Sequence, residues 1–298
     1  MRKTHSFVFG ALLLGTMAAC TSNIDPGMDI NAVYQSNLAD ISTYAASKGL
    51  SGASTSSGLY YVLTKPGSSS IAATYGQEVE FNYTLYVLSR STTNTALVTD
   101  KKVDSTYSTT SVFYPLYPGS LKDGLEEGLL KMREGEQAVL LMPSTLAFGS
   151  TTVGNIPASS PVRFDVTLKR SRTEDQQINE YMTANQLTPT EISTSGLRFI
   201  KTLDNPAGVL PTPSQTLIVK YKGKLLRSSS AFDSTGTGTY PTTIGKSIAG
   251  FDEGLAKLKV GEKATLIIPS KIGYGVNGNQ KIPPYAPMRF DIELVSVQ

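Results

Sequence analysis

The sequence of 298 residues contains no tryptophan, one cysteine and one histidine. The histidine is His5 and the cysteine is Cys20, so everything after Cys20 holds neither residue type. Without a histidine or a free thiol, the chain cannot build histidine-based catalytic triads, cysteine nucleophiles or nearly all kinds of zinc site. Any chemistry of this protein therefore uses neither group, and the sequence predicts no metal and no cofactor.

Long apolar runs are also absent. The run at residues 7–14 is too short for a membrane-spanning helix, which needs about 18 residues or more, and no other segment approaches that length. Arg2 and Lys3 precede this run and two alanines precede Cys20, which is the layout of a secretory signal peptide over residues 1–19. This segment resembles the lipobox of bacterial lipoproteins, in which Cys20 would be the acylated first residue. The alternative is an ordinary signal peptide followed by a stray cysteine.

The lipobox resemblance implies a membrane anchor. Acyl chains on Cys20 would attach an otherwise soluble protein to a bacterial membrane, with residues 20–27 as a short polar tether. The position after the cysteine, Thr21, lacks the acidic residue that retains some lipoproteins at an inner membrane. Family analogy therefore favours the outer membrane, with the protein facing the periplasm.

A strong charge of either sign is missing as well. The formal net charge of +3 falls to +1 without residues 1–19, because Arg2 and Lys3 leave and no acid does. A near-neutral surface argues against nucleic acid as a partner. At 298 residues, the chain is long enough for two domains.

Five landmarks follow one another near the C-terminus. They are Ala231–Ser234, Gly250–Leu255, Ile272–Gly275, Lys281–Tyr285 and the alternating run Met288–Leu294. Their order, within residues 196–298, resembles the FKBP-type peptidyl-prolyl isomerases. The resemblance implies an α+β fold in which an antiparallel half-barrel sheet wraps around one short helix, with the ligand pocket between them.

The residue patterns agree with that fold. Phe290, Ile292 and Leu294 alternate with charged residues, as a strand with one buried face requires. The stretches 217–222 and 264–268 are also rich in β-forming residues. A helix is predicted at 251–258, where acids occupy the first turn and lysines follow near the end. This order indicates an α+β fold and not alternating βαβ units.

An internal repeat indicates two such domains. Residues 123–129 match 249–255, and the landmarks that follow recur at a constant offset of 126. Upstream the offset grows to 138, so the first copy carries extra residues around its first hairpin, at 89–110. We therefore predict a degenerate FKBP-like domain over 28–171 and an isomerase domain over 172–298.

A helical segment is expected before each copy. Apolar residues recur at helical spacing, strongly in the first segment and weakly in the second. They are Ile30, Val33, Tyr34, Leu38, Ile41, Tyr44 and Ala45, then Ile178, Tyr181, Met182 and Leu187. Two interpretations remain open, namely packing against the neighbouring domain and a dimerisation arm through which the protein would oligomerise.

The resemblance places the family's pocket on nine positions of the second copy. Four would act in catalysis and five would bind substrate. The catalytic four are Asp233, Tyr274, Phe251 and Ile248, and the others are Tyr221, Phe232, Tyr240, Ile282 and Phe290. Phe251 would form the floor, while the Tyr274 hydroxyl and the Ile248 backbone N–H would donate to a substrate carbonyl. Asp233 would accept from Tyr221 and place a carboxylate near the twisting amide.

The first copy departs from this set. On the same alignment Tyr83, Asp104, Tyr114, Ile156 and Phe164 remain, whereas Val103, Phe148, Leu125 and Lys122 replace Phe232, Tyr274, Phe251 and Ile248. A lysine inside an apolar pocket is costly unless its amine reaches water. We therefore expect a filled or altered pocket, in a domain that is weakly active or inactive.

The predicted chemistry suits the missing residue types. A prolyl bond rotates across a barrier of about 18–20 kcal/mol, and its twisted transition state has lost much of the carbonyl polarity. An apolar pocket favours that state without proton transfer or a covalent intermediate. The sequence thus predicts a peptidyl-prolyl isomerase that assists folding of exported proteins and binds X-Pro segments of unfolded polypeptides. A polypeptide-binding module without turnover and a purely structural lipoprotein remain as alternatives.

Overall fold

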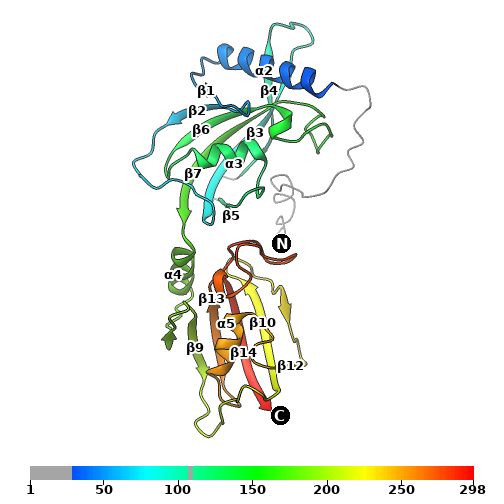
Figure 1. The fold of residues 1–298 in the computed structure, drawn as a ribbon. Helices are drawn as coiled ribbons and strands as arrows, with labels where there is room; N and C mark the ends of the chain where they lie inside the picture. Colours follow the sequence, from blue (N-terminus) through cyan, green and yellow to red (C-terminus); the bar gives the residue numbers. More distant parts are fainter. Residues whose placement is uncertain (1–28, 107–109) are drawn as a thin grey trace, which may run out of the picture. The chain divides into compact units, whose positions relative to one another are not determined.

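The computed structural model describes residues 29–106 and 110–298, which form two compact units divided between Ser171 and Arg172. Cys20, the signal segment and the tether lie outside the described residues. Within the described part of the chain, no helix combines the length and the apolar character needed to cross a membrane. Each unit pairs one seven-stranded antiparallel sheet with helices (Figure 1), so the predicted α+β fold with two half-barrel domains is confirmed.

The first unit begins with helix α2 and closes with the long strand β7. Its sheet has the order β1-β2-β6-β7-β3-β4, with β5 paired to β3. The elements are α2 (Ile30–Ser47), β1 (Ala53–Ser54), β2 (Tyr60–Lys65), β3 (Glu78–Arg90), β4 (Val98–Ser105), β5 (Val112–Pro115), α3 (Asp123–Leu130), β6 (Gln137–Met142), the 3-10 turn η1 (Ser144–Leu146) and β7 (Val162–Arg172).

The second unit repeats this plan element for element. Its sheet has the order β11-β10-β14-β13-β9-β8, with β12 paired to β10. The elements are α4 (Glu174–Ala184), β8 (Glu191–Ile192), β9 (Arg198–Leu203), β10 (Leu217–Leu225), β11 (Asp233–Ser234), β12 (Tyr240–Thr242), α5 (Ala249–Ala256), β13 (Lys263–Ile268), the 3-10 turn η2 (Ser270–Ile272) and β14 (Met288–Val297).

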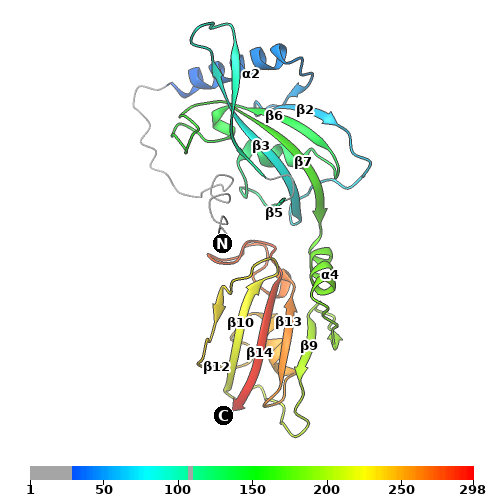
Figure 2. The ribbon, with the colours of Figure 1, turned by 180° about the vertical axis from the view of Figure 1, so that it is seen from behind.

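The main core of each unit lies between the sheet and its short helix, α3 or α5. Figure 1 shows α5 in front of the second sheet, and Figure 2 shows the opposite face of β10, β14 and β13. Glycine allows the close contact, because a Cβ on Gly254 of α5 would lie 2.3 Å from Leu266 Cδ1 on β13. The helix therefore lies directly on the sheet, with Leu255 of α5 and Leu266 of β13 fully buried between them.

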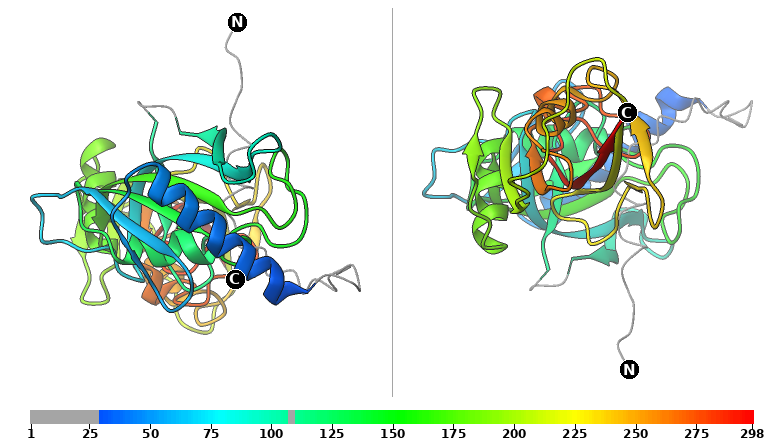
Figure 3. Two further views of the ribbon diagram at one scale, coloured as in Figure 1. Left: turned by 90° about the horizontal axis from the view of Figure 1, so that it is seen from above. Right: turned by 90° about the horizontal axis from the view of Figure 1, so that it is seen from below.

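The helices that precede the domains pack on the other face of the same sheets. Val139 and Leu141 of β6 join Ile41 and Tyr44 of α2 in one cluster, while their neighbours along β6 face α3. Figure 3 shows α2 lying across the strands of its sheet. In the second unit, α4 packs in the same way, through Ile178 against β9 and β13. Strands covered on both faces read as continuous apolar runs, which explains the sequences of β6 and β13.

The insertion found in the first copy lengthens the β3–β4 hairpin. β3 has 13 residues, whereas its counterpart β10 has 9. The added part carries Leu88 and Val98, which are buried in the α2 cluster, and Arg90, which is paired with Asp40 of α2. The extra residues therefore hold the first leading helix in place.

The helix bounds differ from the predicted ones by two residues. α5 runs from Ala249 to Ala256 where the sequence predicts 251–258, because the Ile248 carbonyl already accepts the N–H groups of Phe251 and Asp252. Leu187 likewise lies beyond the end of α4, although its N–H donates to the Met182 carbonyl and its side chain packs on the same cluster.

Candidate active site

One cavity of about 190 Å³ lies between α5 and the β10–β12 side of the second sheet. Eight of the nine side chains predicted for the site line it, together with Ser247, which no sequence pattern indicated. The lining consists of Tyr221, Phe232, Asp233, Tyr240, Ser247, Ile248, Phe251, Tyr274 and Phe290. Residues that span 70 positions of the sequence thus meet at one place.

Ile282 is the predicted site residue that does not line this cavity. Its side chain is only 2% exposed and belongs to the main core of the second unit, with Phe251 and Phe290. Ile282 is therefore part of the core that also contains the floor residue Phe251.

Aromatic rings form the apolar part of the cavity. Phe251 and Phe290 meet edge to face with their ring centroids 5.3 Å apart, and Tyr221 packs on Phe251 in the same way at 5.6 Å. Phe232 contacts Phe290 at 5.6 Å, and Tyr240 contacts Tyr221 at 6.0 Å. Edge-to-face contacts of this kind each contribute about 0.5–1.5 kcal/mol beyond burial of apolar area. The rings hold one another in a fixed arrangement.

Gly223 is a second residue that the sequence did not single out. It lies opposite Asp233 in the β10–β11 pair, beneath the ring of Phe232. A Cβ at this position would lie 2.6 Å from Phe290 Cε1 and 2.8 Å from Phe232 Cζ. Only glycine leaves room for both rings, so the aromatic wall depends on this position.

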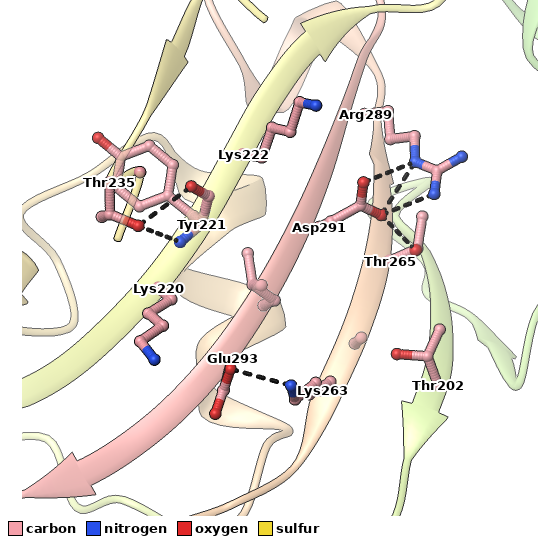
Figure 4. Close-up of a pocket in the computed structure, with 13 residues that line it drawn as sticks. Thr202, Lys220, Tyr221, Lys222, Thr235, Lys263, Thr265, Arg289, Asp291 and Glu293 are labelled. Atoms are coloured by element: carbon pink, nitrogen blue, oxygen red, sulfur yellow. Dashed lines mark hydrogen bonds and ion pairs between the residues drawn. The ribbon is translucent and has the colours of Figure 1, made fainter. Parts of the chain in front are cut away.

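Tyr221 and Asp233 form the polar edge of the cavity. The Tyr221 hydroxyl donates to Asp233 Oδ2 at 2.8 Å. Burial of the ring, together with the neighbouring carboxylate, raises the pKa of Tyr221 to about 12, so the hydroxyl stays protonated at neutral pH. Thr235 holds the backbone of Tyr221 on both sides, because its hydroxyl lies 3.2 Å from the Tyr221 nitrogen and 3.3 Å from the Tyr221 oxygen (Figure 4).

The opposite face of these strands is polar. A depression of about 380 Å³ lies there. Among its lining residues, Arg289 pairs with Asp291 and Lys263 pairs with Glu293 (Figure 4). Arg289 also donates to the Tyr181 hydroxyl of α4 at 3.2 Å. The Arg289–Tyr181 contact joins α4 to β14, the strand that also carries Phe290 of the aromatic cavity.

Ile248 presents a backbone donor at the start of α5. Its N–H has no hydrogen-bond partner among residues 29–106 and 110–298, and its side chain is half-buried at the cavity. The loop before it is held by Asp252, whose Oδ2 accepts the N–H groups of Gly245 at 2.9 Å and Ser247 at 3.2 Å. A buried carboxylate therefore fixes the loop that carries the free donor.

Tyr274 lies on the loop between η2 and β14, flanked by two glycines. The Ser270 carbonyl accepts the N–H groups of both Gly273 and Gly275, each at 2.8 Å. Gly275 has a φ of +62°, a left-handed conformation that glycine adopts without strain. The half-buried Tyr274 side chain is thus held at the cavity with its hydroxyl available to a bound molecule.

The equivalent positions of the first unit are packed more tightly. Tyr83 is 3% exposed, and its hydroxyl still donates to Asp104 Oδ2 at 2.6 Å. Leu125 and Phe148, which replace the floor phenylalanine and the tyrosine, are buried in the core. The Lys122 ammonium lies 5.5 Å from the centre of the Phe148 ring, so the lysine is accommodated at the ring face instead of in an apolar pocket.

The second-unit cavity therefore combines an aromatic interior, two hydrogen-bond donors and one carboxylate. Within the described residues, no group of three or more histidine, cysteine, aspartate or glutamate side chains is arranged to hold a metal ion. A family model described as FKBP-type peptidyl-prolyl cis-trans isomerase matches residues 69–169 and 208–295, one stretch in each unit. The chain belongs to the FKBP family of peptidyl-prolyl cis-trans isomerases.

Individual FKBP proteins resemble one or both units. FK506-binding protein 1B of Neurospora crassa is 42% identical over 111 residues, which are 33% of this chain and 98% of that protein. Peptidyl-prolyl cis-trans isomerase FKBP9 of Homo sapiens is 30% identical over 210 residues, which are 68% of this chain and 34% of that protein. The chain therefore spans about a third of the length of FKBP9.

A solved structure is also similar to part of this chain. The crystal structure of FkpA from Escherichia coli shares 30% sequence identity, with a TM-score of 0.38, over 42% of this chain and 59% of that one.

Proposed function

We propose that this FKBP protein is a peptidyl-prolyl cis-trans isomerase whose active site is the aromatic cavity of its second domain. The observation that carries the proposal is the convergence of eight side chains, chosen from sequence alone, on one cavity of about 190 Å³. A space of that size suits a proline ring and the amide before it, since pockets for drug-sized ligands are larger, about 300–1,000 Å³.

The catalytic principle is differential binding of the twisted amide. The rings of Tyr221, Phe251 and Phe290 exclude water, and a twisted amide with reduced carbonyl polarity is better accommodated there than the planar ground state. About 6 kcal/mol of such preference corresponds to about 10⁴-fold acceleration. No proton transfer or covalent bond is required, so a histidine or a thiol is not needed.

Two donors and one carboxylate orient the substrate. The Tyr274 hydroxyl and the Ile248 N–H would donate to carbonyl oxygens of the bound peptide. Both lie at the cavity, and neither has a competing partner within the described part of the chain. Asp233, held by the Tyr221 hydroxyl, places negative charge beside the amide that rotates. In this proposal Asp233, Tyr274, Phe251 and Ile248 act on the twisting bond, while Tyr221, Phe232, Tyr240 and Phe290 hold the proline.

A protease-coupled assay with an X-Pro peptide tests the proposal on the whole chain. We expect the wild-type protein to accelerate isomerisation, and Tyr274→Phe to lower kcat/KM about fivefold, because one hydrogen bond is worth about 1 kcal/mol. Asp233→Ala should lower kcat/KM by a similar or larger factor. A wild-type rate equal to the uncatalysed rate would refute the isomerase function.

A second candidate function is polypeptide binding without turnover. The first domain favours it for that part of the chain, because Tyr83, Leu125 and Phe148 are buried in its core. A denatured client protein that binds the whole chain, and still binds after Tyr274→Phe and Asp233→Ala, would assign binding to a surface other than the second-domain cavity. The prolyl assay then decides whether turnover accompanies binding.

We also propose that the protein is a bacterial lipoprotein that acts on exported polypeptides. The support is the sequence before Cys20, and the localisation that it favours is the outer membrane facing the periplasm. Metabolic labelling with a radioactive fatty acid should mark the wild-type protein and leave Cys20→Ala unlabelled. Fractionation should recover the wild type with outer membranes, and recovery of the labelled protein with inner membranes would contradict the outer-membrane placement.

A further inference from the structure

Helix α4 makes a direct contact with the loop that carries Tyr274. Glu174, the first residue of α4, lies 96 positions before Ser270 in the sequence. Its carboxylate accepts both donors of Ser270, the backbone N–H at Oε1 and the hydroxyl at Oε2, the latter at 2.9 Å. One side chain of the leading helix therefore uses both donors at the start of η2.

Ser270 also holds the backbone on both sides of Tyr274. Its carbonyl accepts the N–H groups of Gly273 and Gly275 at 2.8 Å each, so the residues on both sides of Tyr274 are bonded to one oxygen. The Tyr274 carbonyl accepts from Gly278 at 3.1 Å. The position of the Tyr274 hydroxyl thus follows from Ser270, and the position of Ser270 follows from Glu174.

The first domain contains the same arrangement built from different residues. Asn37 of α2 is 4% exposed, and its Oδ1 accepts the N–H of Ser144 at 2.8 Å. The Ser144 carbonyl accepts from Ala147 and Gly149, the residues on both sides of Phe148, at 3.0 and 2.8 Å. Asn37 lies in the middle of α2 and accepts only the Ser144 N–H, whereas Glu174 begins α4 and accepts two donors. In both domains a side-chain oxygen of the leading helix accepts the serine N–H, so an amide can hold this loop as well as a carboxylate.

The charged form of Glu174 is disfavoured by burial and stabilised by Ser270. Burial raises the pKa of the Glu174 carboxyl, and the hydrogen bonds from the Ser270 N–H and hydroxyl oppose that rise. Loss of the carboxylate leaves a part-buried N–H without a partner, which is costly. The loop should then shift or loosen to reach water.

We propose that Glu174 is a positioning residue for Tyr274, so that the leading helix α4 belongs to the active site of the second domain. The proposal rests on the proposed isomerase function, in which Tyr274 donates to the substrate. Glu174 itself is absent from the cavity lining and acts through the Ser270 backbone.

Amide hydrogen exchange on the whole chain tests the structural part without any assay of activity. Glu174→Ala should accelerate exchange at Gly273 and Gly275 and leave Ala147 and Gly149 unchanged. The matched variant Asn37→Ala should do the reverse. Unchanged exchange at Gly273 and Gly275 in Glu174→Ala would overturn the proposal.

Prolyl isomerisation tests the functional part. Glu174→Ala should lower kcat about fivefold with little change in KM, and Glu174→Gln, which keeps an acceptor for Ser270, should recover most of the loss. Asn37→Ala should leave both values unchanged. A thermal melt of each variant identifies unfolding, and if Glu174→Ala does not fold, Glu174→Gln should show a smaller loss in the same direction.

A double-variant cycle with Tyr274→Phe shows whether Glu174 acts through Tyr274. In the Tyr274→Phe background, Glu174→Ala should have no further effect on kcat, because the hydroxyl it positions is gone. Multiplying effects would overturn the proposal. An inactive wild-type chain would refute the isomerase function, while the exchange experiment would still decide whether Glu174 holds the loop.

Discussion

The two domains share one sheet order but divide the space beneath the sheet differently. In the first domain, Leu85 pairs with Asp104 across the strands, the smaller Val103 precedes Asp104, and Leu85 is fully buried. In the second domain, Gly223 occupies the position of Leu85, and Phe232 occupies the position of Val103. The larger side chain of the two lies on the strand in the first domain, as Leu85, and on the loop in the second, as Phe232. The first domain therefore has a filled core at this place, and the second has an aromatic wall around a cavity.

The hydrogen bond between tyrosine and aspartate persists through this change. It measures 2.6 Å from Tyr83 to Asp104 and 2.8 Å from Tyr221 to Asp233. In the first domain it is enclosed beneath a buried ring, and in the second it borders an open cavity. The pair alone therefore marks the scaffold, and the aromatic set around it distinguishes a candidate active site from a structural contact.

Replacing Gly223 and Phe232 by the residues of the first domain should have the largest effect on turnover. Gly223→Leu with Phe232→Val fills the cavity, because any Cβ at 223 lies 2.6 Å from Phe290 Cε1. We expect kcat/KM for an X-Pro peptide to fall at least about 100-fold, toward the uncatalysed rate. The reverse pair in the first domain, Leu85→Gly with Val103→Phe, should leave turnover by the second unchanged. Retention of half the activity by a folded variant with Gly223→Leu and Phe232→Val would place the site elsewhere.

Removing the tyrosine hydroxyl in each domain separates stability from turnover. Tyr83→Phe should lower the free energy of unfolding of the first domain by about 1–3 kcal/mol, because the Asp104 oxygen loses a buried donor. Tyr221→Phe should cost less stability, since water can reach the Asp233 carboxylate, and should slow isomerisation. Urea denaturation and the prolyl assay measure the two quantities. A larger stability loss for Tyr221→Phe than for Tyr83→Phe would contradict the contrast.

Exchanging the floor residues should have an intermediate effect. Phe251→Leu removes the edge-to-face contacts with Tyr221 and Phe290, each worth about 0.5–1.5 kcal/mol. We expect kcat/KM to fall about tenfold. The matched change Leu125→Phe should overpack the first core and destabilise it by about 1–3 kcal/mol without adding activity. A gain of turnover from Leu125→Phe would show that the first domain lacks only its floor.

An ion pair specific to the second domain should give the smallest effect, in acid stability. Burial raises the pKa of Glu262, but Lys201 Nζ at 2.8 Å and backbone N–H groups outweigh it and lower that pKa from 4.5 to about 2. A carboxyl with a depressed folded-state pKa stabilises the fold above pH 4.5 and loses this contribution as the pH falls toward 2.

The test replaces Lys201 by leucine, the residue that the first domain has at this position. Leu63 occupies the position of Lys201 and pairs with β6 as Lys201 pairs with β13. Lys201→Leu should lower the melting temperature at neutral pH and reduce its fall between pH 4.5 and pH 2. An unchanged melting temperature at pH 7 would show that backbone donors alone hold Glu262.

Much of the fold could be predicted from local patterns. The alternation in Met288–Leu294 and the apolar run at 264–268 form β14 and β13. Such strands can be predicted because the burial of each residue follows from its type and its place in the pattern. The pocket set could be chosen because the landmarks occur in family order. Eight of those side chains line one cavity, whereas Ile282 is buried in the core, a distinction that sequence spacing does not reveal.

The features that escaped prediction depend on contacts between distant residues. Gly223 resembles any strand glycine until Phe232 and Phe290 are seen to meet above it. Glu174 resembles an ordinary first-turn acid, favourable near a helix N-terminus, and nothing in the sequence links it to Ser270. The apolar stripe of each leading helix allows two interpretations, because it shows that a face is covered and does not show by what.

Phe251, the buried floor of the cavity, also provides a spectroscopic handle. Because the 298-residue chain has no tryptophan, Phe251→Trp would place a single indole at the base of the cavity, against Tyr221 and Phe290. Its fluorescence would be free of background from any other indole, and its emission would shift as a proline-containing peptide replaced water above the ring. Binding to the second domain could then be followed in the intact two-domain protein, because the first domain contributes no indole emission.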